Sequence, residues 1–543
     1  ITLASEIGVY DYTPEMVVSK GRLRPGDMFA VDTENGNVLL PEDIDNDLKS
    51  RYPYREWLKQ QVMYLESSFA QEEACNVAMN SERLKVYRKM FQVSNEEMEQ
   101  VIKVLANGGQ EAIGSMGDDT PLPVFSNQQR SIYDYFRQQF AQVTNPPIDP
   151  LRESIVMSLE TCFGNEQNLF EHNAEHAVRI VVNSPVLSVS KFNQLLAVED
   201  RRFRHYELDM NIPASVSLET AIRELCLQAA EAVRDGVRIL VLSDRNIKQG
   251  CLPLHALLAT GAVHHHLIDE GLRCDTNIVV ETATARDPHH FAALIGYGAS
   301  AVHPYLAYDC ICHMISEGEF RDVQAAHAVQ TYRKGINKGL YKILSKMGIS
   351  TITSYRGAQL FESVGLGQEV VDLCFKGTAN RIGGAGFAEL THDQQQLAKS
   401  AWMPRKDIVH GGLLKYMHQG EYHAFNPDVV HALHAAVESG DYADYQEYTK
   451  LVNDRPVTVI RDLLSLDDRV EPIPLESVDG EAEILRRFES GAMSLGALSP
   501  EAHETLAIAM NRLGGRSNSG EGGEDPARFN TDKAVSYTHL RAH

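Results

Sequence analysis

The sequence predicts a multidomain α/β protein: a central α/β domain with a parallel sheet, a β-rich N-terminal remnant and a C-terminal strand–loop–helix unit. A chain of 543 residues is too long for one hydrophobic core, so we expect about two to four domains. From about residue 178, short apolar stretches alternate with segments of helix length. Continuous apolar strands separated by helices are typical of a parallel sheet that is covered on both faces.

Residues 1–58 have the pattern of a β-rich domain. The stretch 22–40 predicts two strands joined by a turn at Asn35-Gly36, because both residues tolerate the positive φ of a hairpin turn. The chain begins with Ile rather than Met, within sequence that already has the pattern of folded protein. We therefore expect a piece of a longer polypeptide, in which a preceding domain ends near residue 58.

Residues 59–150 are predicted to form a helical connector. Apolar residues recur there at helical spacing, and Asn107-Gly108-Gly109 predicts the end of a helix. A stiff turn at Asn145-Pro146-Pro147-Ile148-Asp149-Pro150 closes the connector. The segments with helical spacing are 58–69, 81–91, 95–107 and 127–143.

The central α/β domain is predicted over residues 151–440, with a linker at 441–479. In a parallel sheet, the residues just beyond the carboxyl ends of the strands form the ligand face. The glycine-rich stretch 381–386 lacks the context of a phosphate-binding motif and predicts a plain loop. The expected strands are 237–245, 277–287, 299–308 and 349–357, and their ligand-face residues are Ser243-Asp244-Arg245, Glu281-Thr282-Ala283, His303-Pro304-Tyr305 and Ser354-Tyr355-Arg356.

A strand-like segment from Gly491 to Gly496, which contains Met493 and Ser494, opens the C-terminal unit at 480–534. Its small residues would let a flat ring such as a flavin approach the backbone closely. A helix is predicted directly after it. Ser499 as N-cap, followed by Pro500 and Glu501, marks the start of this helix, and Gly514-Gly515 marks its end. Its predicted apolar face consists of Ala502, Leu506, Ala509, Met510 and Leu513.

Such a strand–loop–helix unit belongs either to an α/β barrel or to an open sheet. The loop that follows, from Asn518 to Asp525, combines glycines with carboxylates and contains Ser519, Glu521 and Glu524. Flexible backbone amides beside carboxylates suit a ligand loop or channel, and they suit a solvated acidic turn equally well.

The composition excludes several classes of protein. Lys and Arg total 51 against 74 Asp and Glu, a net charge of −23, which argues against a nucleic-acid or anionic-membrane surface. The longest apolar runs, such as 237–242, have the length of a strand, so no transmembrane helix is expected. The 8 cysteines form no CxxC pair and predict reduced thiols rather than a disulfide framework.

Neither a metal site nor a self-sufficient nucleophilic site is expected. The histidine clusters lack a carboxylate or cysteine partner in register, and no second cysteine pair accompanies Cys310-Ile311-Cys312-His313. No GxSxG motif or ordered Ser-His-Asp set occurs. The histidine clusters are His172 with His176, His264-His265-His266, and His289-His290.

Long collinear motifs run along the chain: EAIGSMGDDTPLPVFS (111–126), NPPIDPLRESIVMSLE (145–160), RCDTNIVVETATARDPHHFAALIGYGA (273–299), GINKGLYKILSKMGISTITSYRGAQLFESVGLG (335–367), GGLLKYMHQGEYHAFNPDVV (411–430) and AMSLGALSPEAHETLA (492–507). From residue 1 to about 535 the chain resembles the large subunit of bacterial glutamate synthases, particularly the NADPH-dependent type. The resemblance implies a class II glutamine amidotransferase domain, a central domain and an FMN-binding (β/α)8 synthase domain. The implied parts are 1–58, the end of the amidotransferase domain; 59–150, the connector; 151–440, the central domain; 441–479, the linker; 480–534, the start of the barrel; and 535–543, a tail outside the family pattern.

The resemblance also implies a reaction. Glutamine is hydrolysed, the ammonia travels through a tunnel to 2-oxoglutarate, and reduced FMN delivers hydride to the resulting iminoglutarate to give glutamate. An iron–sulfur cluster (3Fe-4S) relays electrons from a small subunit, a flavoprotein that oxidises NADPH. The resemblance implies a cytoplasmic location, with no nucleic acid or membrane as partner.

Few residues of that machinery are expected in this chain. The family's nucleophilic cysteine would precede Ile1, and the cluster cysteines would follow residue 535. The isolated chain is therefore expected to retain no cofactor and to act as a scaffold or ammonia-tunnel fragment; an independent α/β flavoprotein, related by fold alone, is the other alternative. The implied flavin-side residues are Gly491, Met493, Ser494 and Gly496, the implied residue at the tunnel exit is Glu501, and those near the synthase site are Ser519, Glu521 and Glu524.

Overall fold

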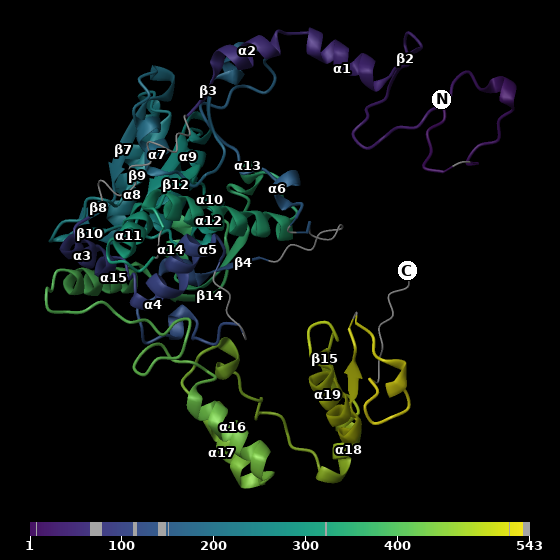
Figure 1. Ribbon diagram of the computed structural model, residues 1–543, viewed down its shortest axis with the longest axis vertical. Coiled ribbons are helices and arrows are strands. Elements are labelled where there is room, and N and C mark those ends of the chain that lie inside the picture. Colours follow the sequence, from purple (N-terminus) through teal and green to yellow (C-terminus); the bar gives the residue numbers. More distant parts are fainter. Residues whose placement is uncertain are drawn as a thin grey trace. The chain divides into compact units, whose positions relative to one another are not determined.

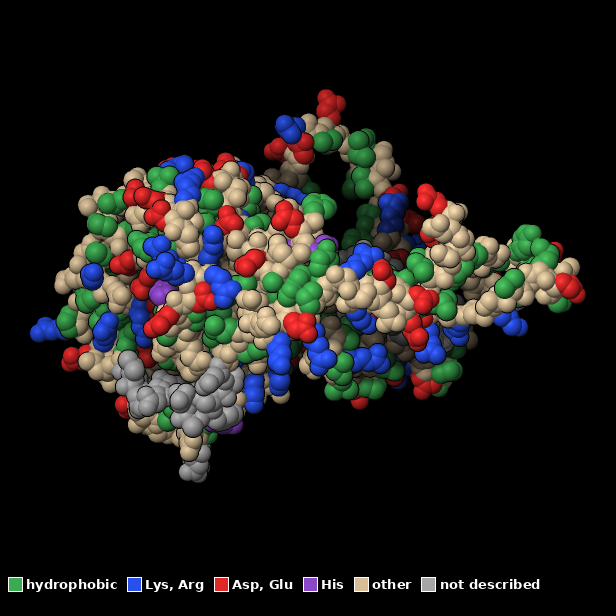
Figure 2. Space-filling model, turned by 90° about the horizontal axis from the view of Figure 1, so that it is seen from above, with side chains coloured by type: hydrophobic (Ala, Val, Ile, Leu, Met, Phe, Trp, Pro, Cys, Tyr) green, Lys and Arg blue, Asp and Glu red, His purple; other side chains and the backbone are tan. Residues whose placement is uncertain are grey.

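The computed structural model of the chain (Figure 1) describes residues 1–543 except 7, 66–78, 112–116, 140–147, 150, 321–322, 521 and 536–543. The chain divides into two compact units, residues 1–463 and residues 464–543, each of which is described by itself. Within the described ranges, no helix has both the length and the apolar character needed to cross a lipid bilayer. On the face seen in Figure 2, acidic and basic side chains are interspersed with hydrophobic ones.

The first unit contains the predicted N-terminal hairpin. Its two strands pair antiparallel, with Ala30 opposite Leu39 and Asp32 opposite Asn37. Gly36 in the turn has a φ of 71°, the left-handed conformation that glycine adopts without steric cost. The hairpin prediction is thus confirmed, although the strands are shorter than the stretch 22–40. The elements here are β1 (Ala30–Asp32), β2 (Asn37–Leu39), α1 (Pro41–Ser50) and α2 (Tyr54–Gln61).

A 4-stranded parallel sheet, with strand order β12-β11-β9-β7, forms the centre of the first unit. Successive residues of β9 enter different cores, as the alternation of side chains along a strand requires. Leu240 and Leu242 join the core that the helices form, whereas Ile239 and Val241 join a second core with Phe192. The predicted parallel sheet, covered on both faces, is confirmed. Its strands are β7 (His205–Asp209), β9 (Ile239–Ser243), β11 (Asn277–Glu281) and β12 (Ala301–His303).

Helices alternate with these strands along the chain (Figure 1). Polar N-caps fix several of their starts: Ser217 accepts a hydrogen bond from the Thr220 amide, and Asp287 accepts one from the His290 amide. α8 and α9 pack against each other and against the sheet. The helices around the sheet are α7 (Val189–Leu196), α8 (Leu218–Arg234), α9 (Ala256–Asp269), α10 (Pro288–Gly296), α11 (Tyr305–Ser316) and α12 (Ala325–Met347).

Within the stretch 59–150, helices form between residues 81 and 108, and Gly109, with a φ of 58°, ends the last of them. The helix predicted over 58–69 is wrong at Val62–Tyr64, where the chain forms a strand. The helix predicted over 127–143 is wrong, because a strand begins at Phe136. Phe136 lies opposite Ser363 and Gln138 opposite Phe361 in an antiparallel strand pair, so pairing with a distant segment overrides the helical spacing of Ile132, Tyr133 and Phe136. The predicted turn at 145–150 lies mostly outside the described residues. The elements are β3 (Val62–Tyr64), α3 (Ser81–Met90), α4 (Asn95–Glu97), a π-helical turn (Met98–Ile102), α5 (Lys103–Gly108) and β4 (Phe136–Gln138).

Two further predictions are wrong. The expected strand 349–357 instead contains a short helix, in which Ile352 and Tyr355 are buried one turn apart. The expected loop 381–386 is a strand that pairs parallel with β13. Gly384 permits this pairing, because a Cβ atom there would lie 2.2 Å from the carbonyl oxygen of Gly365. The remaining elements of the unit are α6 (Glu153–Val156), β5 (Thr161–Phe163), β6 (Arg179–Val182), β8 (Asn211–Pro213), β10 (Cys251–Pro253), α13 (Ile352–Tyr355), β13 (Phe361–Leu366), α14 (Gln368–Cys374), β14 (Ala379–Ala385), α15 (Phe387–Ala401), α16 (Pro427–Ser439) and α17 (Tyr442–Asn453).

Candidate functional site

The second unit is built around one strand–helix–strand motif. Its two strands pair in parallel, with Glu489 opposite Arg516 and Ala492 opposite Asn518. The carboxyl ends of parallel strands meet at one edge of a sheet, and ligands of α/β folds bind at that edge. The loops that begin at Met493 and at Ser519 therefore start side by side. The elements are α18 (Glu481–Leu485), β15 (Glu489–Ala492), α19 (Pro500–Leu513) and β16 (Arg516–Asn518).

Helix α19 forms where the sequence predicts it. The Ser499 side chain accepts a hydrogen bond from the Ala502 amide, and Gly514, with a φ of 74°, ends the helix in the left-handed conformation. The predicted apolar face is wrong: Leu506 and Leu513 are exposed, and the buried side chains of the helix are His503 and Ala507. The helix packs on the strands through a face rotated by about one residue, or roughly 100°, from the expected one.

Hydrogen bonds fix the backbone of both loops. The Met493 amide donates to the Asn518 carbonyl over 2.8 Å, and the Gly520 amide donates to Asn518 Oδ1 over 2.8 Å. The carbonyl of Met493 accepts a hydrogen bond from His503 Nε2 over 3.0 Å. His503 is fully buried, so this contact anchors the loop to α19 in a dry environment.

Glycines allow the two loops to touch. A Cβ atom at Gly522 would lie 2.7 Å from the amide nitrogen of Leu495 and 2.9 Å from Ser494 Oγ. Gly520, with a φ of 57°, turns the chain between Asn518 and Gly522. By contrast, nothing lies within 4 Å of a Cβ atom built at Gly491 or Gly496, so the space beside these two residues is open.

The predicted site residues are distributed unevenly over this edge. Met493 is buried, Ser494 is half-buried, and Ser519 is buried with no hydrogen-bond partner for its hydroxyl among the described residues. The structure therefore brings the segments of Met493, Ser494 and Ser519 together. Two further predicted residues, Gly491 and Gly496, are exposed.

The predicted carboxylates have different surroundings. Glu524 Oε2 accepts a hydrogen bond from the Val535 amide over 2.8 Å, and Val535 packs with Met493 in the small core of this unit. Glu501 is exposed in the first turn of α19, where hydrogen bonds from its own backbone amide and from Ser499 lower its pKa. It therefore carries a full negative charge near neutral pH. Glu521 lies outside the described residues.

Sequence reasoning missed His503. Its imidazole holds the backbone of Met493 in place, and its Nδ1 has no hydrogen-bond partner among the residues that the structure describes. Its only sequence signal is its place four residues before Ala507, at the spacing that puts two side chains on one helix face.

The carboxyl edge of the central sheet in the first unit forms a closed polar network. Asp244 accepts hydrogen bonds from Thr282 Oγ1 over 2.5 Å, from the Ala283 amide over 3.0 Å and from Tyr305 OH over 2.8 Å. Glu281 accepts hydrogen bonds from Ser243 Oγ and from Arg245 Nη1, both over 2.7 Å. Burial raises the pKa of Asp244 to about 7. The polar side chains at this edge are therefore engaged in hydrogen bonds with one another.

Three of the four predicted ligand-face segments contribute to this edge, and the fourth does not. Arg356 donates from Nη1 to Ser300 Oγ over 3.0 Å, and Ser300 directly precedes β12. Tyr355 OH accepts a hydrogen bond from Gln138 Nε2 over 2.8 Å. The prediction for Ser354-Tyr355-Arg356 is wrong because its strand is a helix, which places these residues near the amino ends of the parallel strands.

The histidine clusters serve the packing of the protein. His264 Nδ1 accepts a hydrogen bond from Arg273 Nε over 2.8 Å, and His289 Nε2 donates to the Tyr133 carbonyl over 3.0 Å. His172 stacks on Tyr52 at 5.3 Å between ring centroids. Within the described ranges, no group of three or more His, Cys, Asp or Glu residues is arranged to hold a metal ion. The free thiols are Cys162, Cys226, Cys251, Cys274, Cys310 and Cys374, whereas Cys312 is disulfide-bonded, so the prediction of reduced thiols is wrong at this residue.

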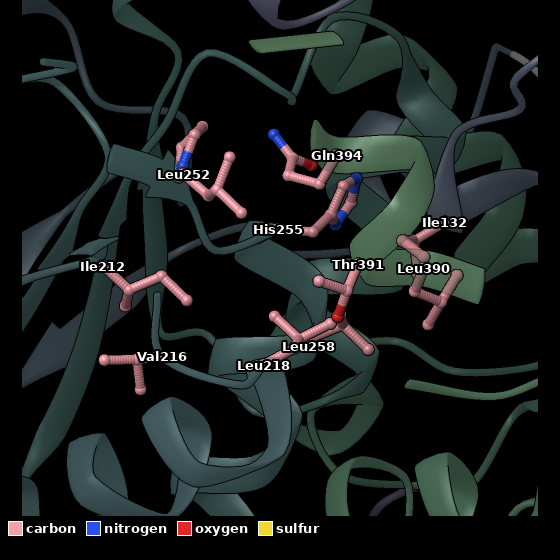
Figure 3. Close-up of a pocket in the computed structure, with 11 residues that line it drawn as sticks. Ile132, Ile212, Val216, Leu218, Leu252, His255, Leu258, Leu390, Thr391 and Gln394 are labelled. Atoms are coloured by element: carbon pink, nitrogen blue, oxygen red, sulfur yellow. The ribbon is translucent and has the colours of Figure 1, made fainter. Parts of the chain in front are cut away.

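A small cavity in the first unit is too apolar and too small for a metabolite (Figure 3). Its volume is about 30 Å³, which is enough for roughly one water molecule. Aliphatic side chains surround it, with His255, Thr391 and Gln394 as the polar exceptions. Burial lowers the pKa of His255 to about 3, so this imidazole is neutral at physiological pH.

Comparison with known protein families gives three matches in succession. Residues 1–57 match class II glutamine amidotransferases, residues 86–367 match the glutamate synthase central domain, and residues 423–539 match a conserved region in glutamate synthase.

Comparison with individual proteins also gives glutamate synthases. The chain is 40% identical over 535 residues to the glutamate synthase [NADPH] large chain of Bacillus subtilis, covering 98% of this chain and 35% of that protein. It is 42% identical over 543 residues to the ferredoxin-dependent glutamate synthase of Pyropia yezoensis, covering 97% of this chain and 35% of that protein. The chain thus spans about a third of the length of these curated relatives. A solved mandelate oxidase structure aligns with 50% of this chain and 97% of its own, at 10% identity and a TM-score of 0.25, too low to indicate a shared fold.

Proposed function

Because this chain belongs to the glutamate synthase family, we propose that it is part of an enzyme that transfers the amide nitrogen of glutamine to 2-oxoglutarate and so makes glutamate. The observation that carries this proposal is the succession of three matches to parts of one enzyme, at 1–57, 86–367 and 423–539. A flavoprotein related by fold alone would not share 40% of its residues along 98% of the chain with a glutamate synthase.

We propose a division of the chain that follows this enzyme. Residues 1–58 belong to the amidotransferase domain, 59–150 to the connector, 151–440 to the central domain, 441–479 to a linker and 480–534 to the synthase barrel. The parallel β15–α19–β16 motif supports the last assignment, because a (β/α)8 barrel repeats this motif. The closed network around Asp244 and Glu281 supports a scaffolding role for the central domain, since its ligand edge is filled by its own side chains.

FMN is the cofactor that we propose for the edge beyond β15 and β16. The residues there fit one side of a flavin, because open space lies beside Gly491 and Gly496, where a flat ring can approach the backbone. Gly491, Met493, Ser494 and Gly496 would hold the flavin through close approach of the backbone. Bound FMN would supply the hydride that reduces iminoglutarate to glutamate, and an iron–sulfur cluster elsewhere in the barrel would supply electrons.

The contribution of this chain to that chemistry is positional. His503 and Asn518 fix the backbone of Met493 from two sides, which keeps the flavin side of the loop in one conformation. We assign Glu501, Ser519, Glu521 and Glu524 to the ammonia and 2-oxoglutarate side. An ionised Glu501 accepts hydrogen bonds from ammonia or ammonium that arrives near the N-terminus of α19.

We propose NADPH as the source of electrons, delivered through a flavoprotein small subunit. The Bacillus subtilis relative is an NADPH enzyme and the Pyropia yezoensis relative is ferredoxin-dependent, at similar identities of 40% and 42%. Reduction of the complete enzyme by NADPH with the small subunit, and not by ferredoxin, would support this choice. The cytoplasmic location stays a prediction.

Assays of the purified chain test the proposal that it works only as a part. We expect no glutamate from glutamine, 2-oxoglutarate and a reductant, and less than one equivalent of FMN, because one β15–α19–β16 motif provides only one edge of a flavin site. Turnover by the chain alone would refute this role. A flavin absorbance band of one equivalent, without turnover, would favour an independent flavoprotein instead.

A further inference from the structure

A second cavity in the first unit lies between α3, the start of α4, the end of α11 and the segment 407–410. We propose that this cavity binds a small anion through phosphate or carboxylate oxygens. Its volume is about 440 Å³, within the range of roughly 300–1,000 Å³ that small-molecule sites occupy. It is lined by Ser81, Leu84, Lys85, Arg88, Asn95, His313, Asp407, Ile408 and His410.

Arg88 is the principal cation of this cavity. Its Nη2 donates to Asn95 Oδ1 over 2.8 Å and its Nε to the Val93 carbonyl over 3.3 Å, both of which are neutral acceptors. In the part of the chain that the structure describes, no carboxylate forms an ion pair with this half-buried guanidinium. An unpaired guanidinium that is partly removed from water favours an anionic partner.

Two carboxylates that attract Arg88 are paired with other cations. Electrostatic attraction to Arg88 comes from Glu97 and Glu319. Glu97 pairs with Arg286 over 2.5 Å, and Glu319 pairs with Lys103 over 3.0 Å. Arg88 is therefore not neutralised by a carboxylate of its own.

Two lysines add to this positive charge. Lys85 pairs over 3.2 Å with Asp407, whose side chain is 90% exposed and therefore strongly screened by water. Lys89, next to Arg88, is buried and donates to the carbonyl oxygens of Met403 and Lys406, over 2.7 and 3.3 Å. The described lining therefore holds the cations Lys85 and Arg88 against the single carboxylate Asp407, with the buried Lys89 directly beside Arg88, in a chain whose net charge is −23.

The wall of the cavity at 407–410 is held in place by its neighbours. The amides of Asn95 and Glu96 donate to the carbonyls of Val409 and His410 over 3.1 and 2.7 Å. The Glu96 carboxylate accepts hydrogen bonds from four consecutive amides, at residues 412–415, over 2.7–3.2 Å. Those four hydrogen bonds hold residues 412–415 against Glu96, so the wall is ordered before any ligand binds.

The histidines favour an oxyanion over other ligands. His313, in the last turn of α11, and His410 both line the cavity, and an imidazole N–H is a hydrogen-bond donor to phosphate or carboxylate. Among the described lining residues, Asp407 is the one carboxylate against the two cations Lys85 and Arg88, which disfavours a cationic ligand. Of the lining residues that the structure describes, two, Leu84 and Ile408, are apolar, which disfavours a hydrophobic ligand.

Calorimetric titration of the purified chain with inorganic phosphate and, separately, with succinate tests this proposal. We expect saturable binding of at least one anion at a single site, weakened at least tenfold by Lys85→Met and by Arg88→Gln. The control Lys376→Met removes an exposed lysine that pairs with Asp269 away from the cavity, and it should bind as the unmodified chain does.

The two anions distinguish the source of the oxyanion. Phosphate alone would identify a phosphorylated ligand, succinate alone a carboxylate, and either result supports the site. If Arg88→Gln does not fold, Lys85→Met and His410→Gln decide, since both positions are partly or fully exposed. The proposal is overturned if neither anion binds saturably, or if Lys85→Met and His410→Gln bind as tightly as the control.

Discussion

The contact between the two loops of the C-terminal unit can be tested at one glycine. In Gly522→Ala, the new Cβ would lie 2.7 Å from the Leu495 amide nitrogen and 2.9 Å from Ser494 Oγ. The serine side chain can rotate away, but the backbone nitrogen cannot. Since ordinary contacts are about 3.5–4.0 Å, the loops must separate by about 1 Å. Overpacking of this kind costs about 1–3 kcal/mol, which corresponds to an opening equilibrium roughly 5- to 150-fold more favourable.

Hydrogen–deuterium exchange measures this opening locally. The reporting amides are Met493, which donates to the Asn518 carbonyl, and Gly520, which donates to Asn518 Oδ1. We expect their protection to fall in Gly522→Ala by the factor given above. The matched control is Gly496→Ala, where no atom lies within 4 Å of the new Cβ and protection should stay within about 0.5 kcal/mol of the original. Equal protection in both variants would refute the contact and the edge built on it.

Two further predictions concern the first unit. Gly384→Ala places a Cβ 2.2 Å from the Gly365 carbonyl oxygen, so it should destabilise the fold by about 1–3 kcal/mol or more and lower the melting temperature measured by calorimetry. In the control Gly383→Ala, the new Cβ lies 3.9 Å from the Leu366 carbonyl oxygen, and the melting temperature should change little. Equal melting temperatures of the two variants would contradict the β13–β14 pairing. Burial raises the pKa of Asp244 from 3.8 to about 7, so the neutral carboxyl stabilises the fold fully below about pH 4, and this contribution is lost as the pH rises through about 7. Asp244→Asn stays neutral at every pH. The melting temperature of the original chain relative to this variant should therefore fall as the pH rises from about 4 to about 7, whereas a constant difference would contradict the raised pKa of Asp244.

Local sequence signals predicted those elements that depend on backbone conformation alone or that are apolar on every side. Asn35-Gly36 specifies its hairpin through backbone conformation alone, and the apolar run 239–242 is buried on both faces of its sheet. The segment 127–143 misleads, because Tyr133 and Phe136 have helical spacing but are buried by distant parts of the chain. Gly384 shows the same limit, since its role as a contact point for Gly365 exists only after β13 and β14 pair.

The candidate site was predictable as a segment but not as a geometry. Ser499, Pro500 and Gly514 encode α19 locally, and the structure has this helix as expected. Which face of the helix is buried depends on the strands on either side, so His503 replaced Leu506 as the inward residue. A single sequence carries no signal for such a choice, because both faces contain apolar residues at helical spacing.

The central claim, that this chain is a working part of a glutamate synthase, is tested most directly by exchange. The Bacillus subtilis large chain matches it over 535 residues, so that stretch can be replaced by this chain. We predict that the chimaera binds FMN and forms glutamate from glutamine, 2-oxoglutarate and NADPH in the presence of the small subunit, at a rate within about tenfold of the original. A chimaera that folds and binds FMN but forms no glutamate from glutamine would contradict the claim.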